Sequence, residues 1–269
     1  MNNDVTIVTA LFNMNRDKLD GRKWNNYLKW FSNFLKLNSP LIIFTSPDLN
    51  EFIKSRRSNI NTKILNSDLN EIPYFYLFNQ IMEIINSQKF KNNVKDINRI
   101  ECKDPLYLII QFSKFFWLRK AAFMNFFNSQ QFLWLDAGSS RFFEDFNLKK
   151  SFPSTFGKYL LKDIGDTFLV QMNYDCYPDL YNKSNLEFNY LYDNRSFVLG
   201  SLFGGNKKII DKISDLVDDL LLNKMIKNGI INNDQVALAY LVKNNPELFS
   251  IYCRKDKKHL SLFSLLSIS

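Results

Sequence analysis

Strand and helix patterns alternate along the first 66 residues of the chain, and this alternation constrains the fold more than any other feature. The β-branched, apolar run at 5–12 is typical of a buried strand, and 41–45 and 63–65 follow the same pattern. Between them, aromatic and leucine side chains at spacings of three and four predict a helix over 24–35, and Ser46-Pro47-Asp48 starts a shorter one. Alternating strands and helices predict a mainly parallel α/β sheet flanked by helices.

A fourth strand ends at an acid. Residues 132–142 read FLWLDAGSSRF, so an apolar, aromatic run stops at Asp136 and passes into a Gly-Ser turn. A long helical pattern over 105–127 precedes this strand. Because ligands of open α/β sheets bind outside the carboxyl ends of the strands, a carboxylate at this place marks a candidate site. The structural alternative is an Asp that only caps the following Ser-Ser turn.

The rest of the chain carries weaker patterns. Residues 71–85 suit a helix, whereas 89–104 are polar and patternless, so we expect an insert or a mobile loop there. Glycines interrupt a strand pattern over 197–205, which is typical of a bulge or of backbone that comes close to a ligand. The other expected elements are a strand at 168–170, a polar connection over 175–194, and helices over 207–227 and 234–243. Since no repeat or linker is evident, we expect one domain over 1–269.

Composition indicates a globular protein that prefers anions. Hydrophobic residues make up 46% of the chain, enough for a core. No apolar run reaches the ~18–20 residues that a membrane span needs, and the first four residues lack the basic start of a signal peptide, so we expect a cytoplasmic protein. The net charge of +8 favours nucleic acid, nucleotide diphosphates or acidic lipid surfaces as partners. The three widely spaced cysteines are expected to be free thiols.

Five motifs occur in order along most of the chain. They are TIVTALFNMNR at 6–16, YLKWF at 27–31, FSKFFWLRKAAFMNFF at 112–127, FLWLDAGSSRF at 132–142, and NNDQVALAYL with PELF over 232–249. Together they resemble the HtrL/YibB family of bacterial proteins, also called WlaTC/HtrL, which is regarded as glycosyltransferase-like. The chain departs from the family at Asn125-Phe126-Phe127, where Asn-Pro-Phe is usual.

The resemblance implies a glycosyltransferase of the GT-A type, with a Rossmann-like, mixed and mostly parallel sheet flanked by helices. Residues 1–138 would then form the nucleotide-binding half, and 139–269 the acceptor-side half with a C-terminal tail. The expected donor is a nucleoside diphosphate sugar, foremost a UDP-sugar. The expected acceptor is a cell-surface glycan or glycolipid such as lipopolysaccharide, and nucleic acid is not an expected partner of such an enzyme.

A departing diphosphate needs its charge neutralised, commonly by Mn²⁺ or Mg²⁺ held by acids. In this chain the expected acid is Asp136, followed by Ala137 and Gly138, and it is also a candidate catalytic residue. The one histidine, His259, is the candidate second metal ligand, because a histidine late in the chain completes the metal shell in many GT-A enzymes. The alternative for His259 is a solvated residue of a basic tail.

Side-chain cations offer a second way to hold a diphosphate. Arg16, Arg22 and Lys23 follow the first strand, and Arg141 follows Asp136. Among the cations we expect Lys114 to matter most, because the resemblance places a Ser-Lys pair there. Its alternative is a lysine on the helix surface, which is the commoner place for lysines.

The end of the first strand is the expected wall of the nucleotide pocket. Thr9, Ala10 and Phe12 are the candidate binding residues there, and Gly138 is a candidate on the opposite side, after Asp136. Phe12 has a packing alternative, because aromatic side chains more often fill cores than stack on bases.

Asp234 opens the last predicted helix. The helix dipole keeps a carboxylate at this position ionised, which suits a general base that takes a proton from an acceptor hydroxyl. The alternative is an ordinary acid at a helix start. An inverting transfer needs a base, supplied by Asp234 or by chemistry next to Asp136, and a retaining transfer needs none, so the stereochemistry stays open.

The tail from Arg254 to Ser269 is first basic and then apolar. It could contact an anionic membrane, with the inner face as the place of action, or pack on the domain as a closing helix or strand. Two other functions remain open. One is a catalytically inactive nucleotide-binding protein, since a single acid stands where two are usual. The other is a nucleic-acid-binding protein, given the positive charge and the aromatic residues.

Overall fold

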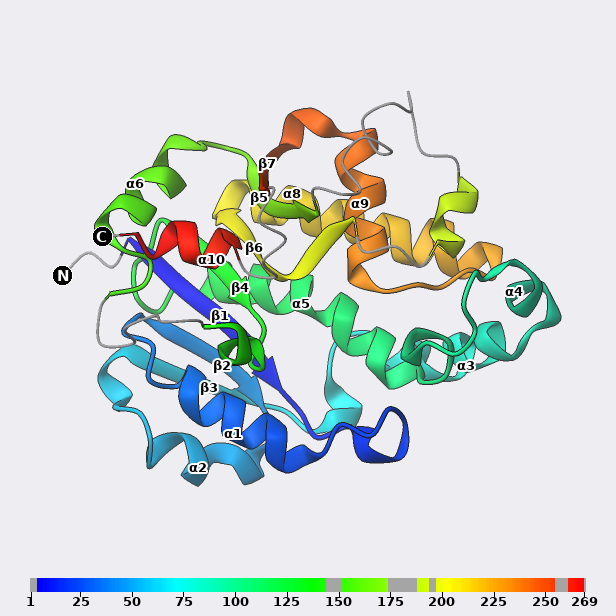
Figure 1. Cartoon of the computed structure of the whole chain (residues 1–269), viewed down its shortest axis with the longest axis horizontal. Helices are drawn as coiled ribbons and strands as arrows, with labels where there is room; N and C mark the ends of the chain where they lie inside the picture. Colours follow the sequence, from blue (N-terminus) through cyan, green and yellow to red (C-terminus); the bar gives the residue numbers. More distant parts are fainter. Residues whose placement is uncertain (1–3, 144–150, 174–187, 194–196, 255–260, 269) are drawn as a thin grey trace.

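The computed structural model describes residues 4–143, 151–173, 188–193, 197–254 and 261–268, and a seven-stranded sheet forms its centre (Figure 1). The strands are β1 (Val5–Leu11), β2 (Leu41–Thr45), β3 (Thr62–Asn66), β4 (Gln131–Leu135), β5 (Phe168–Asn173), β6 (Val198–Asn206) and β7 (Phe249–Arg254). Their order is β3-β2-β1-β4-β6-β5-β7. β6 runs antiparallel to β4 and β5, and the other neighbours are parallel. The predicted mixed, mostly parallel α/β sheet is therefore confirmed.

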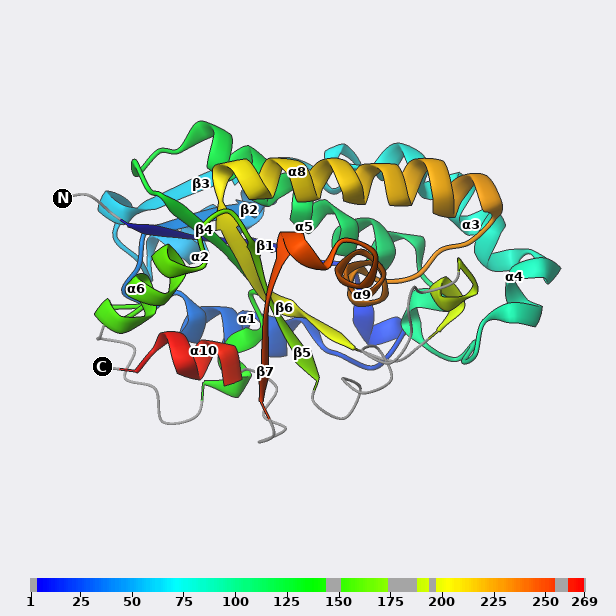
Figure 2. The same cartoon turned by 90° about the horizontal axis from the view of Figure 1, so that it is seen from above.

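Helices cover both faces of this sheet (Figure 2). One face carries α3 (Phe78–Asn86), α5 (Pro105–Met124), α8 (Lys207–Asp218) and α9 (Asp234–Asn244), and the other carries α1 (Trp24–Phe34), α2 (Asn50–Lys54), α6 (Thr155–Asp163) and α10 (Ser261–Leu266). A short helix, α4 (Gln88–Asn93), follows α3, and α8 continues into a π-helical segment, Asp219–Met225. The structure thus has three layers.

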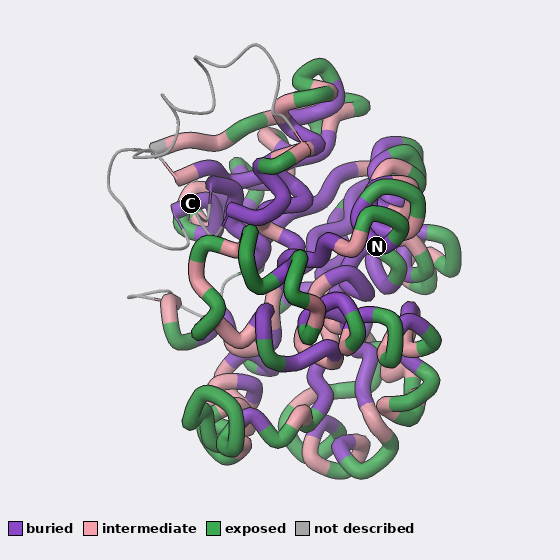
Figure 3. The backbone as a smooth tube through the Cα atoms, turned by 90° about the vertical axis from the view of Figure 1, so that its right-hand side faces the viewer, coloured by how far each residue is buried: buried purple, intermediate pink, exposed green. Residues whose placement is uncertain are grey.

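Side chains of each central strand alternate between the two cores. In β1, Val8 packs into the core beneath α5, whereas Ile7 and Leu11 pack into the core beneath α1. β4 does the same, with Trp134 on the first side and Leu133 on the second. Because both faces are covered, these strands are nearly continuous apolar runs, and Figure 3 shows the buried strands surrounded by exposed outer segments. This burial explains why the strand pattern was readable in the sequence.

The topology brings the ends of β1 and β4 and the middle of β6 together at one edge of the sheet. β1 and β4 are parallel neighbours, so Leu11 and Leu135 end at the same edge. β6 is antiparallel to β4, and Leu202 pairs with Leu135, so the residues just before Leu202 lie beside Asp136. This edge is the one at which ligands bind in open α/β sheets.

The segment 89–104 contains a helix and a helical turn, so the expectation of a mobile loop was wrong. Part of it forms α4, and Ile100–Cys102 form a helical turn with Glu101 and Cys102 buried. No hydrophobic period reveals this order, because long-range polar contacts hold the segment, including a hydrogen bond from Asn233 to Glu101. Cys102 and Cys253 are free thiols as predicted, and Cys176 lies outside the described residues.

The apolar part of the C-terminal tail packs on the domain as a closing helix. α10 contacts α6, and Leu262, Phe263 and Leu266 are buried in the core beneath α1. These side chains are therefore unavailable to a membrane, which contradicts membrane contact through them. The basic residues 255–260, including His259, lie outside the described residues. Within the described part of the chain, no helix has the length and apolar character to cross a bilayer.

Candidate functional site

A cleft of about 540 Å³ opens at the edge where β1 and β4 end. Its walls come from the loop after β1, the turn after β4, the first half of α5, and the segment before α5. The predicted binding residues that line it are Ala10, Phe12, Arg16, Arg22, Lys114, Asp136, Gly138 and Arg141. Thr9 does not line the cleft, because its side chain is fully buried within β1, so the structure gives it no place in the pocket wall.

Phe12 serves the core as well as the cleft. Its ring stacks on that of Trp117, with 5.5 Å between the centroids, and the residue is only 5% exposed. Its packing alternative is therefore borne out, although the residue also lines the cleft.

One carboxylate oxygen of Asp136 is bound within the protein, and the other has no partner among the described residues. Its Oδ1 accepts a hydrogen bond from the Trp134 indole N–H at 2.7 Å and lies 3.1 Å from Lys114 Nζ. Its Oδ2 has no partner among the described residues, and the side chain is 38% exposed. The turn that follows is closed by the backbone carbonyl of Asp136, which accepts from Ser139 N at 2.8 Å. The side chain thus does not cap the turn, and its free oxygen is left to the cleft.

Lys114 is buried, and its ammonium group is saturated. It donates to Gly200 O at 3.0 Å and to Asp234 Oδ2 at 2.8 Å, and its third partner is Asp136 Oδ1. An ammonium group has three N–H donors, so none is left for a diphosphate in this conformation. Burial opposes its charge, but Asp136 and Asp234 outweigh burial and raise its pKa. The burial of Lys114 contradicts the surface alternative, and its contact with a diphosphate stays a prediction.

Asp234 lies below the cleft rather than in it. It begins α9, whose N-cap is Asn233, and its side chain has no exposed surface. Burial raises its pKa to about 6, against the opposing effect of Lys114. Gly200 makes room for it, because a Cβ there would overlap the Asp234 carboxylate. In this conformation the Asp234 carboxylate has no access to an acceptor hydroxyl, and its role as general base stays a prediction. We refer to Lys114, Asp136 and Asp234 as the buried charge cluster.

Three arginines form one side of the cleft, here named the arginine wall: Arg16, Arg22 and Arg141. Arg16 is 8% exposed, and its guanidinium lies 4.9 Å from the centroid of the Tyr107 ring. It donates to Tyr27 Oη at 2.8 Å and pairs with Asp20, which also lies near Arg22 Nε. Arg141 lies over the Trp30 ring at 4.9 Å. Stacking and hydrogen bonds hold these cations with little neutralising charge, and burial together with the nearby Arg22 lowers the pKa of Arg141.

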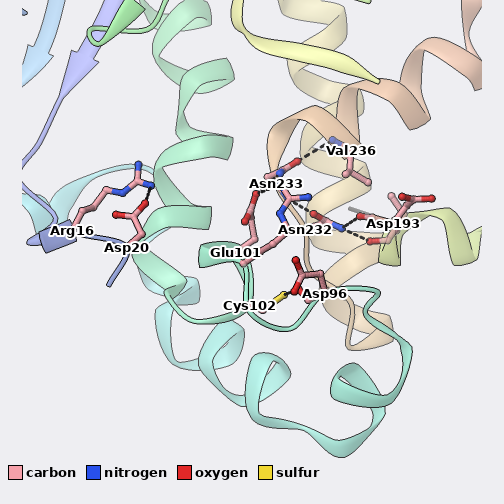
Figure 4. Close-up of polar contacts among 11 residues, drawn as sticks. Arg16, Asp20, Asp96, Glu101, Cys102, Asp193, Asn232, Asn233 and Val236 are labelled. Carbon is pink, nitrogen blue, oxygen red and sulfur yellow. Dashed lines mark hydrogen bonds and ion pairs between the residues drawn. The ribbon is translucent and has the colours of Figure 1, made fainter. Parts of the chain in front are cut away.

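The wall facing the start of α5 was missed in the sequence. Asn98, Arg99, Ile100 and Glu101 line the cleft there. Glu101 Oε1 accepts hydrogen bonds from Asn233 Nδ2 and Arg99, both at 2.6 Å, and Figure 4 shows it reaching the start of α9. Asn232 donates in turn to the backbone oxygens of Leu191 and Asp193. Nothing local in the sequence shows that Asn233 anchors a wall 132 residues away.

The described residues do not by themselves compose a metal site. Across the parts of the chain that the structure describes, no three His, Cys, Asp or Glu side chains gather as they would around a metal. A cation next to Asp136 would find one free carboxylate oxygen, Oδ2, and would lie near the Lys114 ammonium. Asp234 is bound to Lys114, and Asp20 to Arg16. The predicted second ligand, His259, is outside the described residues.

Nearly the whole chain matches a known protein family. The model of a family described as "Bacterial protein of unknown function (HtrL_YibB)" matches residues 3–267. Protein HtrL of Escherichia coli (strain K12) is 23% identical over 281 residues, which cover 98% of this chain and 92% of HtrL.

Solved structures give weaker likenesses. Mouse xyloside xylosyltransferase 1 in its apo form has a TM-score of 0.45 at 10% identity, covering 93% of this chain and 85% of that one. Inositol-1-phosphate CTP transferase from T. maritima has a TM-score of 0.38 at 10% identity, covering 99% and 96%. The PaToxG glycosyltransferase has a TM-score of 0.30 at 12% identity, covering 97% and 74%. Since a TM-score below 0.5 does not establish a common fold, function has to be inferred from the cleft itself. On the full-length family match, the chain belongs to the HtrL/YibB family.

Proposed function

We propose that the protein is a glycosyltransferase of the GT-A type that moves a sugar from a nucleoside diphosphate donor, foremost a UDP-sugar, to a cell-surface glycan or a glycolipid such as lipopolysaccharide. In this proposal residues 1–138 together with Arg141 bind the nucleotide, and the acceptor side of the single domain comes from the rest of 139–269. The acceptor and the sugar are the parts of the proposal that depend most on the family resemblance.

The observation that carries the proposal is the joint placement of the arginine wall and Asp136. Arg16 and Arg22 come from the loop after β1 and Arg141 comes from the turn after β4, yet all three line the same cleft as Asp136. Fixed guanidinium groups suit phosphate oxygens, because their planar N–H groups match phosphate geometry and their charge persists at all physiological pH values. A cleft of about 540 Å³ is within the range of small-molecule sites.

The proposed chemistry follows from this arrangement. The arginine wall binds the diphosphate and stabilises the negative charge that grows on it as the glycosidic bond breaks. Asp136 directs Oδ2 toward the donor, while Trp134 and Lys114 hold Oδ1 in place. Asp234 acts through Lys114 as a positioning residue. Because the described residues compose no metal site, no step is assigned to Mn²⁺ or Mg²⁺. The experiment below measures whether activity depends on Mn²⁺.

Release of nucleotide from a panel of nucleotide sugars tests the proposal, measured with and without Mn²⁺ and with Asp136→Asn as the matched variant. Asn keeps the size of the side chain and removes its charge. We expect slow donor hydrolysis by the natural protein and at least a tenfold loss in the variant. Nucleotide binding without turnover on the whole panel would instead favour a catalytically inactive member of the family, and the absence of any nucleotide binding would contradict both.

A further inference from the structure

Several buried polar atoms on the cleft walls have no hydrogen-bond partner among the described residues. They are Ser139 Oγ, Ser201 Oγ, Gln235 Oε1 and Arg16 Nε. The Ser139 and Ser201 residues are only 2% and 7% exposed. More than about 90% of buried polar groups in proteins are hydrogen-bonded, and an unsatisfied one costs about 1–3 kcal/mol. Their collection in one cleft therefore points to a ligand that satisfies them.

Three of these atoms belong to residues around Asp136. The backbone N–H of Asp136 donates to Ser201 O at 3.0 Å, and Ser139 N donates to Asp136 O at 2.8 Å. Gln235 follows Asp234, which is joined to Asp136 through Lys114. The three residues come from β6, the turn after β4, and α9, so three separate elements bring these residues to the walls of one cleft. Arg16, by contrast, belongs to the arginine wall.

The chemistry of the three side chains fits a ring that carries several hydroxyl groups. A serine hydroxyl both donates and accepts, and the Gln235 oxygen only accepts. Sugar hydroxyls can fill all of these roles, whereas an apolar ligand would leave every one of the atoms unsatisfied. A phosphate offers acceptors only, so it could not satisfy the Gln235 oxygen.

From their shared place in the cleft we infer that Ser139, Ser201 and Gln235 form the subsite that binds the sugar of the donor, next to Asp136, while the arginine wall binds the diphosphate. The inference rests on the proposed function and deepens it. A site built from buried hydrogen-bonding groups discriminates strongly, because a sugar that lacks a matching hydroxyl leaves a buried group unpaired. These three residues therefore set the choice of sugar.

Binding affinities of UDP and of matched UDP-sugars test the subsite, measured by titration calorimetry on the natural protein, Ser201→Ala, Gln235→Met and the double variant. The probes are UDP, UDP-glucose, UDP-galactose, UDP-N-acetylglucosamine and UDP-glucuronate. In the natural protein the preferred sugar should tighten binding beyond UDP alone. Each substitution should reduce that gain about threefold to tenfold, the range for one neutral hydrogen bond, and leave the affinity for UDP within about twofold.

Ser214→Ala is the matched control. Ser214 is also buried, but its hydroxyl donates to Phe115 O on α5, and the residue does not line the cleft. Ser214→Ala should change neither the affinity for UDP nor the affinity for the UDP-sugars. Thermal unfolding of every variant checks that the fold is kept, and Ser139→Ala provides an independent third position.

Two results would overturn the inference. One is an unchanged sugar gain in the double variant. The other is a loss of UDP affinity as large as the loss of sugar affinity, which would place these residues in the nucleotide site. Failure of the proposed function looks different, because the natural protein would then bind none of the five probes.

Discussion

The buried charge cluster and the arginine wall adjoin the same cleft but differ in how their charges are paired. In the cluster, Lys114 faces two carboxylates and a backbone oxygen, and all its donors are used. In the wall, Asp20 is the acid beside Arg16 and Arg22, and among the described residues Arg141 has no ion pair. One ammonium thus meets two carboxylates in the cluster, whereas in the wall two guanidiniums share one carboxylate and the third, Arg141, has no ion pair among the described residues.

This difference predicts different roles for the two regions. Charges that satisfy one another fix the geometry of the protein, and charges that lack a partner are available to a ligand. The cluster should therefore control stability and the position of Asp136, and the wall should control the affinity for anions. Substitutions in each region test whether the cluster controls stability and the wall controls affinity for anions.

The largest effect is expected from Lys114→Met. It leaves Asp234 buried without its cation, which costs about 3–5 kcal/mol of the free energy of unfolding. Chemical denaturation measures the loss. The double variant Lys114→Met with Asp234→Leu removes both charges and should recover most of it. A single variant that loses less than about 1 kcal/mol, or a double variant no better than the single, would contradict the cluster's structural role.

Arg16→Ala is expected to act on affinity instead. Removing one charge-assisted contact should weaken UDP binding about 10- to 100-fold and reduce its dependence on salt. Arg56→Ala is the control, because Arg56 lies over Phe52 and does not line the cleft. Titration of UDP at two salt concentrations measures both the affinity and its dependence on salt. Equal losses in the two variants would mean that general positive charge, rather than the wall, attracts the nucleotide.

Gly200→Ala should disturb the cluster without changing any charge. The added Cβ would overlap the Asp234 carboxylate, at an expected cost of about 1–3 kcal/mol in the free energy of unfolding. Gly138→Ala is the matched control, since its nearest atom would be Trp30 Cε3 at 3.6 Å, an ordinary contact. If the two variants are equally stable by denaturation, Asp234 is not packed against Gly200 as described.

A smaller effect should appear in the pH dependence of stability. The pKa of Asp234 is raised by burial from 3.8 to about 6, so the folded state binds its proton more tightly than the unfolded state. Its contribution to stability is full below pH 3.8 and is lost as the pH rises to about 6. Relative to Asp234→Asn, the natural protein should lose at most about 1.4 kcal/mol per pH unit across this window. A difference that stays flat or grows with pH in denaturation experiments would disprove the shift.

The contrast between the apolar strands and the long-range polar contacts explains which parts of the site could be predicted from the sequence. The strands around Asp136 were readable because both faces of β1 and β4 are buried, which leaves continuous apolar runs. Asp136 was found because it ends such a run. The surroundings of Lys114 were not readable, since its partners are up to 120 residues away and depend on the absence of a side chain at Gly200.

Polar long-range contacts account for the other differences. Glu101 lies in a segment without a hydrophobic period, and its place in the cleft wall depends on Asn233. Asp234 was correctly expected at a helix start, but its burial comes from packing against β6 and α5, which local sequence does not encode. The arginines line the cleft because Arg16 and Arg22 lie in the loop after β1 and Arg141 lies in the turn after β4, and both strands end at the cleft.

The most direct test of the account is a crystal structure of the protein with UDP bound. The account predicts the diphosphate in the cleft beside β1 and β4, with its oxygens within hydrogen-bond distance of Arg16, Arg22 or Arg141 and its terminal phosphate directed toward Asp136. A nucleotide bound elsewhere on the molecule, or an empty cleft at saturating UDP, would contradict it.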